Sequence, residues 1–129
     1  MTETLRAGPL LQIRDLCTVF ESPDGVVRAA DGVSFDVGES EIVALVGESG
    51  CGKSATALSI LRLIDPPGRI ASGSIRLRER ELLTLTEREM RAVRGREIAM
   101  VFQEPMTALN PLMTVGRQVM EVFHVHQDL

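Results

Sequence analysis

The stretch Gly47–Ser54, GESGCGKS, decides the fold class of this 129-residue chain. It matches the pattern G-x-x-x-x-G-K-[ST], in which glycines let the backbone curl closely around phosphate groups. Successive N–H groups and the N-terminus of a following helix then point at negative charge. Lys53 is the only lysine among fourteen basic residues. A compact ammonium can serve several phosphate oxygens in a tight loop, which the wide planar fork of arginine does not easily enter.

The residues on either side of this stretch predict the strand and the helix that the motif needs. Ile42–Val46 is apolar on both faces, which is typical of a strand covered by helices on each side. Lys53–Ile64 carries apolar residues at helical spacing, and the DPPG sequence at 65–68 ends that helix. The glycines therefore lie in a predicted strand-to-helix turn, where the pattern indicates a phosphate-binding loop.

The residue types in the loop predict the part that each plays around a nucleotide. Lys53 is expected to reach the β- and γ-phosphates, and the Ser54 hydroxyl to ligate Mg²⁺. We expect the side chain of Cys51 to point away from the phosphates, because the sequence shows no base partner for a thiol nucleophile. The loop residues expected to bind nucleotide are Gly47, Glu48, Ser49, Gly50, Cys51, Gly52, Lys53 and Ser54. The alternative is a glycine-rich turn that caps a helix and binds nothing.

The pattern outside the loop predicts antiparallel β structure before it and mixed structure after it. Residues 1–9 are expected to form a flexible tail. Before the loop, we predict strands over Leu10–Phe20, Val26–Ala30 and Val33–Val37, with a turn at Ser22–Gly25. After it, we predict strands at Gly73–Leu77 and Glu97–Phe102, a helix from a capping box at Thr86–Glu89 to near Gly95, and a last helix with Val115, Val119, Val122 and Phe123 on one face.

Composition limits the remaining possibilities. The net charge of −4 argues against a nucleic-acid partner, and the run Arg76–Arg96 mixes seven arginines with four glutamates, which favours a solvated face. No apolar run has the length of a signal peptide or a membrane span, so we expect a cytosolic chain. Cys17 and Cys51 lack zinc spacing, and His124 and His126 have no ligand set nearby.

Gln103 follows the predicted strand 97–102 and has three interpretations. It is a polar side chain that a strand end delivers to Mg²⁺ and the attacking water, or an ordinary loop glutamine. In the third, residues 99–104 form a degenerate second nucleotide motif with Glu104 as general base. A Mg²⁺-binding carboxylate would be expected where Gln103 stands, which disfavours the third interpretation.

Taken together, these stretches resemble the ATP-binding subunit of an ATP-binding cassette (ABC) transporter, in the oligopeptide, dipeptide and nickel importer branch. The resemblance rests on VALVGESGCGKSATALSILRLI at 43–64, REIAMVFQEPMTALNP at 96–111 and TVGRQVMEV at 114–122, and it covers about residue 10 to the end. The phosphate loop alone indicates only a P-loop NTPase, whereas FQEPMTALNP narrows the branch.

The resemblance implies an α/β fold: a P-loop NTPase (RecA-like) core of an ABC nucleotide-binding domain with an N-terminal antiparallel β subdomain. Residues 10–40 would be the antiparallel β part, and 41–129 would hold the P-loop strand and helix, the Q-loop and the start of the helical subdomain. Phe20 would stack on adenine, and Gln103 would be the Q-loop glutamine, a second Mg²⁺ ligand. At Ala55, many members have a threonine that contacts the α-phosphate, so only the backbone N–H remains to bind there.

The resemblance also implies partner proteins and a limit on the activity of this chain alone. Glu104–Pro111 and the helix after it would face permease subunits, and a second ATPase subunit would complete the site at the inner face of the membrane. The family's signature motif, Walker B strand and switch histidine are not among the 129 residues. We therefore expect inefficient hydrolysis by this chain alone, and an unpaired apolar edge at Ile42–Val46 that invites aggregation. The alternatives are a non-hydrolysing nucleotide-binding fragment and an unrelated P-loop phosphotransferase.

Overall fold

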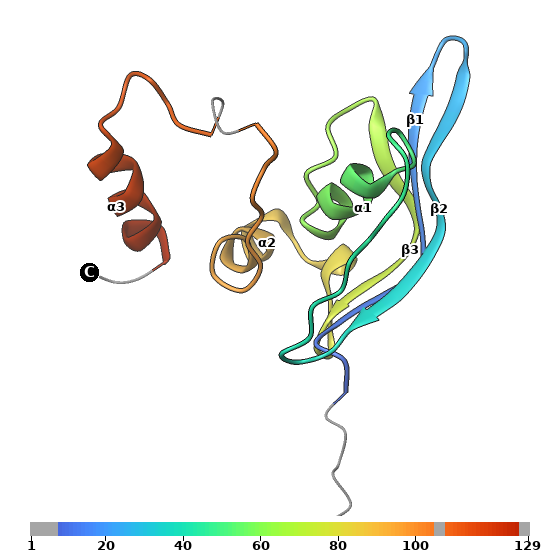
Figure 1. Ribbon diagram of the computed structural model, residues 1–129, viewed down its shortest axis with the longest axis horizontal. Coiled ribbons are helices and arrows are strands. Elements are labelled where there is room, and N and C mark those ends of the chain that lie inside the picture. The colour runs from blue at the N-terminus through green and yellow to red at the C-terminus, as the bar shows by residue number, and fades with distance from the viewer. Residues whose placement is uncertain (1–7, 105–107, 127–129) are drawn as a thin grey trace, which may run out of the picture. The chain divides into compact units, whose positions relative to one another are not determined.

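The computed structural model describes residues 8–104 and 108–126, and the chain divides into two compact units, Met1–Leu85 and Thr86–Leu129. The first unit contains a four-stranded sheet and the helix that follows the glycine loop (Figure 1). The second contains two helices joined by irregular segments. Most of the predicted tail, residues 1–7, lies outside the described residues.

The sheet of the first unit is antiparallel throughout, with strand order β2-β1-β3-β4. Its strands are β1 (Leu11–Ser22), β2 (Gly25–Val37), β3 (Gly68–Leu77) and β4 (Arg80–Glu81), and a short 3-10 helix, η1 (Leu82–Thr84), follows. The predicted antiparallel opening and the turn after Ser22 are confirmed, because Ser22 pairs with Gly25. The two segments predicted at 26–30 and 33–37 belong to the single strand β2, since Gly32 is accommodated at φ 68° without ending the strand.

Helix α1 (Lys53–Ile60) begins where the glycine loop ends, as predicted, but it stops four residues before Ile64. A left-handed turn ends the helix. Arg62 adopts a left-handed φ of 53°, and the N–H groups of Arg62 and Leu63 donate to the carbonyl oxygens of Ser59 and Leu58 at 3.0 and 2.9 Å. This pair of bonds is the Schellman arrangement that closes helix C-termini. The Arg62 guanidinium also donates to the carbonyl oxygens of Leu82 and Leu85, which favours the left-handed turn at a residue other than glycine.

A buried hydrogen bond attaches α1 to the sheet. The hydroxyl oxygens of Thr18 on β1 and Ser59 on α1 lie 2.7 Å apart, and both residues have 0% exposure. Ser59 donates its one proton to the carbonyl oxygen of Ala55 at 2.6 Å, so Thr18 is the donor in the pair. Apolar side chains of the sheet, Ile13, Leu16 and Ile75, are fully buried in the same unit. The helix that carries the end of the glycine loop is thus fixed to β1 by a specific polar contact.

We expect Thr18→Val to lower the free energy of unfolding by about 1 kcal/mol, because Ser59 keeps its bond to Ala55 and loses only the incoming donor. Ser59→Ala should cost more, about 1–3 kcal/mol, because it leaves the buried Thr18 hydroxyl without an acceptor. The double variant should be less destabilised than the sum of the two, as urea unfolding followed by circular dichroism can measure. Additive effects would contradict a direct bond between the two side chains.

Two strands predicted from apolar runs are absent from the described residues, and both predictions are wrong for this structure. Ile42–Val46 forms no strand, and Ile42 is 97% exposed. Residues 97–102 contribute only an isolated bridge between Arg94 and Ile98, and Val101 is 96% exposed. A strand needs hydrogen-bonding partners along its edges. None of the described strands pairs with either segment.

The second unit contains α2 (Glu87–Val93) and α3 (Val115–His126). The predicted capping box is confirmed: the Glu89 N–H donates to the Thr86 hydroxyl at 3.3 Å, and the Thr86 N–H donates to the Glu89 carboxylate at 2.7 Å. The last predicted helix is also confirmed, and its apolar side chains, Val115, Val119, Met120, Val122, Phe123 and Val125, are exposed. Over the described part of the chain, no helix reaches the length and apolarity of a membrane span.

Candidate functional site

The glycine loop between residue 46 and α1 is shaped by backbone conformations that only glycine adopts without strain. Gly50 and Gly52 have φ of 80° and 92°, in the left-handed region, and Gly52 is the N-cap of α1. Gly47 leaves room inside the loop, because a Cβ there would lie 2.4 Å from Cys51 Sγ and 3.9 Å from Lys53 Nζ. Left-handed residues that alternate with others turn backbone N–H groups to one side, which makes an anion-binding concavity.

Lys53 holds its ammonium within this loop. Its Nζ donates to the carbonyl oxygens of Gly47 and Glu48, each at 2.7 Å, and lies 3.3 Å from Cys51 Sγ. The Cys51 side chain is therefore turned toward the ammonium. A half-buried ammonium that donates hydrogen bonds to carbonyl oxygens can donate them to phosphate oxygens instead. The loop thus places one positive charge beside the N-terminus of α1, where the helix dipole also favours an anion.

The remaining loop residues form the turn of the loop and the first residues of α1. Ser54, the second residue of α1, is exposed, so its hydroxyl is accessible at the helix N-terminus. Ala55 follows and carries only its backbone groups. Glu48, Ser49 and Gly50 form the exposed turn of the loop, which the Cys51 N–H closes by donating to the Glu48 carbonyl at 3.3 Å.

The end of the loop rests on strand β2. A Cβ added to Gly52 would lie 1.8 Å from the carbonyl oxygen of Ala29, so only glycine permits this approach. Together with the bond between Thr18 and Ser59, this contact fixes the start of α1 against both β1 and β2. The sequence did not reveal either contact, since the partners are more than twenty residues apart. The sequence indicated only that Thr18 and Phe20 share one face of β1, because side chains alternate along a strand with a period of two residues.

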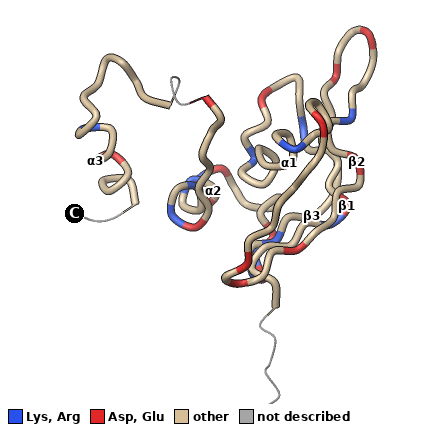
Figure 2. Tube along the Cα trace, viewed as in Figure 1, with Lys and Arg blue, Asp and Glu red and all other residues tan. Residues whose placement is uncertain are grey.

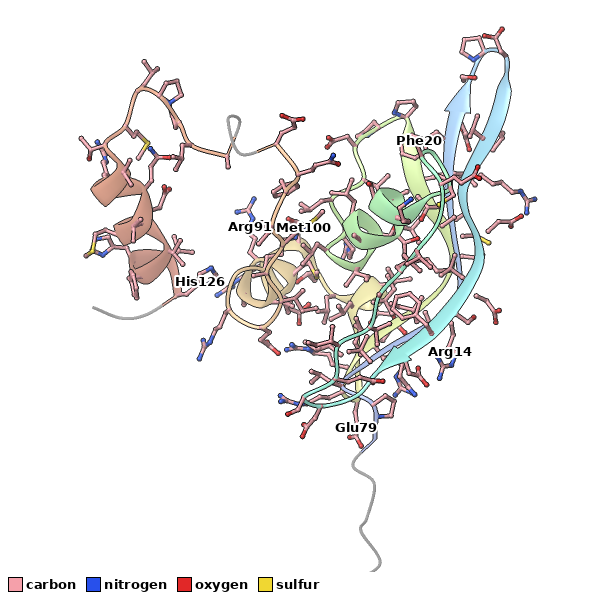
Figure 3. The ribbon with its side chains drawn as sticks, viewed as in Figure 1. Arg14, Phe20, Glu79, Arg91, Met100 and His126 are labelled. Carbon is pink, nitrogen blue, oxygen red and sulfur yellow. The ribbon has the colours of Figure 1, made fainter. Side chains whose placement is uncertain are left out.

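Phe20 lies near the hairpin end of β1 (Figure 3). It follows Thr18 by two residues, so both side chains leave the strand on the face that α1 covers. The ring is half-buried, with its edge against Gly68 of β3. The structure therefore brings Phe20 and the start of α1 to the same part of the first unit, as a site for both a base and its phosphates requires.

Gln103 belongs to the second unit, where it is exposed and stands in a bend. The prediction that a strand delivers it is wrong for this structure, because 99–102 is not a strand. Among the described residues, no group of three or more His, Cys, Asp or Glu is placed to hold a metal ion. A Mg²⁺ site here would therefore depend on hydroxyl, amide and phosphate oxygens.

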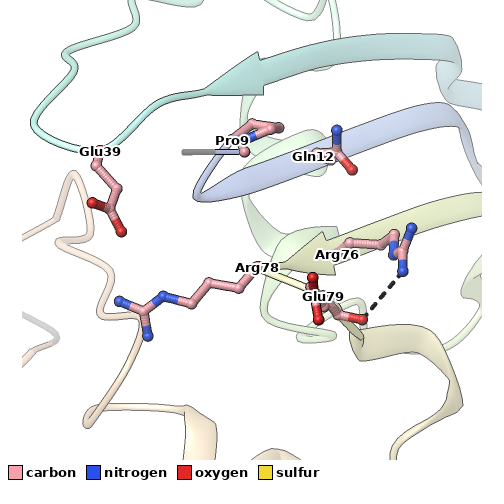
Figure 4. Close-up of a pocket in the computed structure, with 7 residues that line it drawn as sticks. Pro9, Gln12, Glu39, Arg76, Arg78 and Glu79 are labelled. Atoms are coloured by element: carbon pink, nitrogen blue, oxygen red, sulfur yellow. Dashed lines mark hydrogen bonds between the residues drawn. The ribbon is translucent and has the colours of Figure 1, made fainter. Parts of the chain in front are cut away.

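Charged residues at the other end of the sheet line a separate pocket of about 750 Å³ (Figure 4). Its walls include Gln12, Glu39, Arg76, Arg78 and Glu79, and the Arg76 guanidinium donates to the carbonyl oxygen of Glu79 at 3.2 Å. Gln12 pairs with Arg76 at this end of the sheet and lies eight positions from Phe20 along β1. The pocket is therefore roughly 26 Å from Phe20. It is not part of the phosphate-loop site.

Acidic residues alternate with arginines along 76–96 (Figure 2). In α2, the Glu87 carboxylate accepts from Arg94 at 2.5 Å and lies 3.9 Å from Arg91. Pairs of opposite charge such as these are typical of a solvated face. They differ from the continuous positive surface that binding of a nucleic-acid backbone requires.

Comparison with known proteins finds relatives that align with almost the whole chain. A probable peptide ABC transporter ATP-binding protein of Sinorhizobium fredii is 50% identical over 127 residues, 98% of this chain. A peptidoglycan transport ATP-binding protein of Agrobacterium fabrum is 52% identical over 130 aligned positions, 100% of this chain. The chain spans 38% and 24% of the length of these two curated relatives.

The fold has a counterpart among solved structures. The dimeric post-hydrolysis state of the ATP-binding cassette MJ0796, bound to ADP and Pi, matches 92% of this chain and 49% of that one, with a TM-score of 0.75 and 21% identity. This likeness shows the fold. The model of the ABC transporter family matches residues 30–128, which include the whole phosphate loop. The chain therefore belongs to the ABC transporter family.

Proposed function

We propose that this chain binds Mg-ATP through loop residues 47–55 and the ring of Phe20. The observation that carries the proposal is the Lys53 ammonium, which is held within a glycine loop at the N-terminus of α1. A cation, a helix N-terminus and inward-facing N–H groups favour phosphate. Phe20 supplies an aromatic face for the base on the same side of the sheet.

Ser54 would hold Mg²⁺ together with phosphate oxygens, and Gln103 is the second ligand that the family resemblance implies. Both offer neutral oxygen ligands, which suit a hard cation that keeps several water molecules. The exposed position of Ser54 beside Lys53 fits this role. When bound, Mg²⁺ would neutralise charge on the phosphates.

We further propose that the chain works in an ATP-driven importer of peptides. The two relatives described above are named for peptide and peptidoglycan transport. Permease subunits would bind the region after Gln103, where part of Glu104–Pro111 lies outside the described residues and α3 presents exposed apolar side chains. A second ATPase subunit would complete the site at the cytoplasmic face of the membrane, and nucleic acid would not be a partner.

Titration calorimetry tests the proposed binding of Mg-ATP, and capture of partners tests the proposed role in peptide import. The chain should bind Mg-ATP with one site, and it should retain the permease subunits of a peptide importer rather than those of a nickel importer. Absence of ATP binding would remove the nucleotide proposal. ATP binding without capture of either permease would favour the other alternative, a non-hydrolysing nucleotide-binding fragment.

We expect inefficient hydrolysis by this chain alone, because the loop would bind phosphate but the residues that the family resemblance assigns to cleavage are not among the 129 residues. An assay of phosphate release from Mg-ATP should give a rate at the level of the Lys53→Ala variant. A rate that clearly exceeds that of the variant would overturn this expectation.

A further inference from the structure

The charged pocket at the far end of the sheet lies on the face that points away from the core (Figure 4). Gln12 on β1 pairs with Arg76 on β3, so their side chains point to the same face of the sheet. The next residues along these strands, Ile13 and Ile75, point to the other face, where both have 0% exposure. The pocket is therefore separate from the core and from the phosphate loop.

Arg78 reaches this pocket from an unfavourable backbone conformation. Leu77 pairs with Arg80, which leaves Arg78 and Glu79 as a two-residue turn between β3 and β4. Arg78 has a φ of 54°, and its N–H donates to the carbonyl oxygen of Leu10 at 2.7 Å. Glycine, asparagine and aspartate usually occupy left-handed positions in such turns, and any of them would avoid the cost that arginine carries there. A residue retained at such a cost points to a function for its side chain.

Charges of both signs line the pocket without neutralising one another. Over residues 8–104 and 108–126, neither the Arg78 guanidinium nor the carboxylates of Glu39 and Glu79 form an ion pair. Figure 4 shows Glu39 and Arg78 extending from different walls, the loop after β2 and the turn after β3. The neighbouring Arg14 differs, because its guanidinium donates to both carboxylate oxygens of Asp36 at 2.5 and 2.7 Å. The charges in the pocket are thus available to a ligand.

We propose that this pocket binds a small zwitterion of the amino acid or short-peptide class. Arg76 and Arg78 supply planar guanidinium donors that match a carboxylate group. Glu39 and Glu79 supply acceptors for an ammonium group, and the Gln12 amide can bond to a peptide group. Two positive and two negative side chains balance, which favours a ligand with both charges over a simple anion or cation. The volume of about 750 Å³ lies within the range of about 300–1,000 Å³ that is typical of small-molecule sites.

Titration of the isotope-labelled chain, followed by amide chemical shifts, measures the affinity and locates the site. The probes are trialanine, N-acetyl-trialanine, trialanine amide and inorganic phosphate. We expect trialanine to bind with roughly millimolar affinity, because the site is open to solvent, and to shift the signals of Gln12, Glu39, Arg76 and Arg78. Blocking either terminal charge should weaken binding about tenfold, as the loss of one charge-assisted hydrogen bond predicts.

Arg78→Asn removes the guanidinium with little risk to the fold. Asparagine tolerates positive φ, so the thermal midpoint should equal or exceed that of the wild type, while trialanine affinity falls about tenfold. Glu39→Gln should weaken trialanine binding to a similar extent but leave N-acetyl-trialanine binding unchanged, because that peptide has no ammonium group. Arg28→Asn is the matched control. It makes the same substitution on β2, where Arg28 pairs with Asp31 at 2.9 Å outside the pocket, and affinity should stay within about twofold.

Three results would overturn the proposal. They are equal affinity for trialanine and both blocked peptides, equal losses in Arg78→Asn and Arg28→Asn, and the absence of shifts at the pocket residues. Phosphate that binds at least as tightly as trialanine, with the same shifts, would also overturn it, because the pocket would then be an anion site. The proposal goes beyond the proposed function and does not rest on it. Arg78→Asn should bind Mg-ATP as the wild type does, so a failure of either proposal leaves the other intact.

Discussion

Lys53→Ala should weaken Mg-ATP binding by roughly 100-fold or more, the largest functional effect that we expect from one side chain. The ammonium supplies charge-assisted hydrogen bonds, each worth about 1.5–3 kcal/mol, and phosphate oxygens would accept more than one of them. Its present partners are carbonyl oxygens of Gly47 and Glu48 in an exposed loop, so their loss should change the free energy of unfolding little. Titration calorimetry measures the affinity, and urea unfolding measures the stability.

Lys53→Arg tests why the chain has lysine at this position alone. Arginine keeps the charge but presents a planar fork to a loop in which Lys53 Nζ lies 3.3 Å from Cys51 Sγ, so we expect a loss nearly as large as that of alanine. Arg14→Ala is the control for net charge. It removes one positive charge from the far end of β1, where Arg14 pairs with Asp36. Equal loss in Arg14→Ala, or unchanged affinity in Lys53→Ala, would contradict a specific phosphate contact.

The elements that the sequence predicted well depend on neighbours in the chain. The capping box at Thr86 closes within four residues, and the turn after Ser22 closes its own hairpin. The start of α1 follows directly from the glycine loop. In each case the hydrogen-bonding partners lie close together in the sequence, so residue type and spacing are enough to identify the element.

The predictions that failed depend on distant partners. Ile42–Val46 and the segment 97–102 have the apolar composition of buried strands, but that composition says nothing about which strand would lie beside them. The predicted end of α1 was also wrong, because a left-handed turn at Arg62 ends the helix early and the Arg62 side chain donates to carbonyl oxygens of Leu82 and Leu85, twenty and twenty-three residues away. Helix length was therefore decided by a tertiary contact that helical periodicity cannot reveal.

The candidate site also has a part that the sequence predicts and a part that it does not. The phosphate loop could be identified from its eight residues, because the chemistry of phosphate binding restricts both residue type and spacing. The attachment of the loop to the sheet could not be identified from the sequence. The contacts of Gly52 with Ala29 and of Thr18 with Ser59 join segments that no local pattern relates. The position of Cys51 Sγ beside Lys53 likewise depends on loop geometry, which residue type and spacing do not reveal.

Gly52→Ala should remove detectable ATP binding and destabilise the first unit. Alanine at φ 92° costs about 1–2 kcal/mol, and its Cβ would lie 1.8 Å from the carbonyl oxygen of Ala29, so either the loop or β2 must move. Overpacking against a backbone atom adds roughly 1–3 kcal/mol. Because Gly52 is the N-cap of α1, any shift also turns the helix N-terminus and Lys53 away from the phosphates.

Gly50→Ala separates the two causes. Gly50 has a similar φ of 80°, but a Cβ there would meet nothing within 4 Å, so only the conformational cost of about 1–2 kcal/mol applies. We expect this variant to keep measurable ATP binding and most of its stability in urea unfolding, whereas Gly52→Ala loses both. Equal behaviour of the two variants would mean that backbone strain alone explains the glycines. The difference that we expect would instead show that close packing on β2 is what aligns α1 with its phosphates.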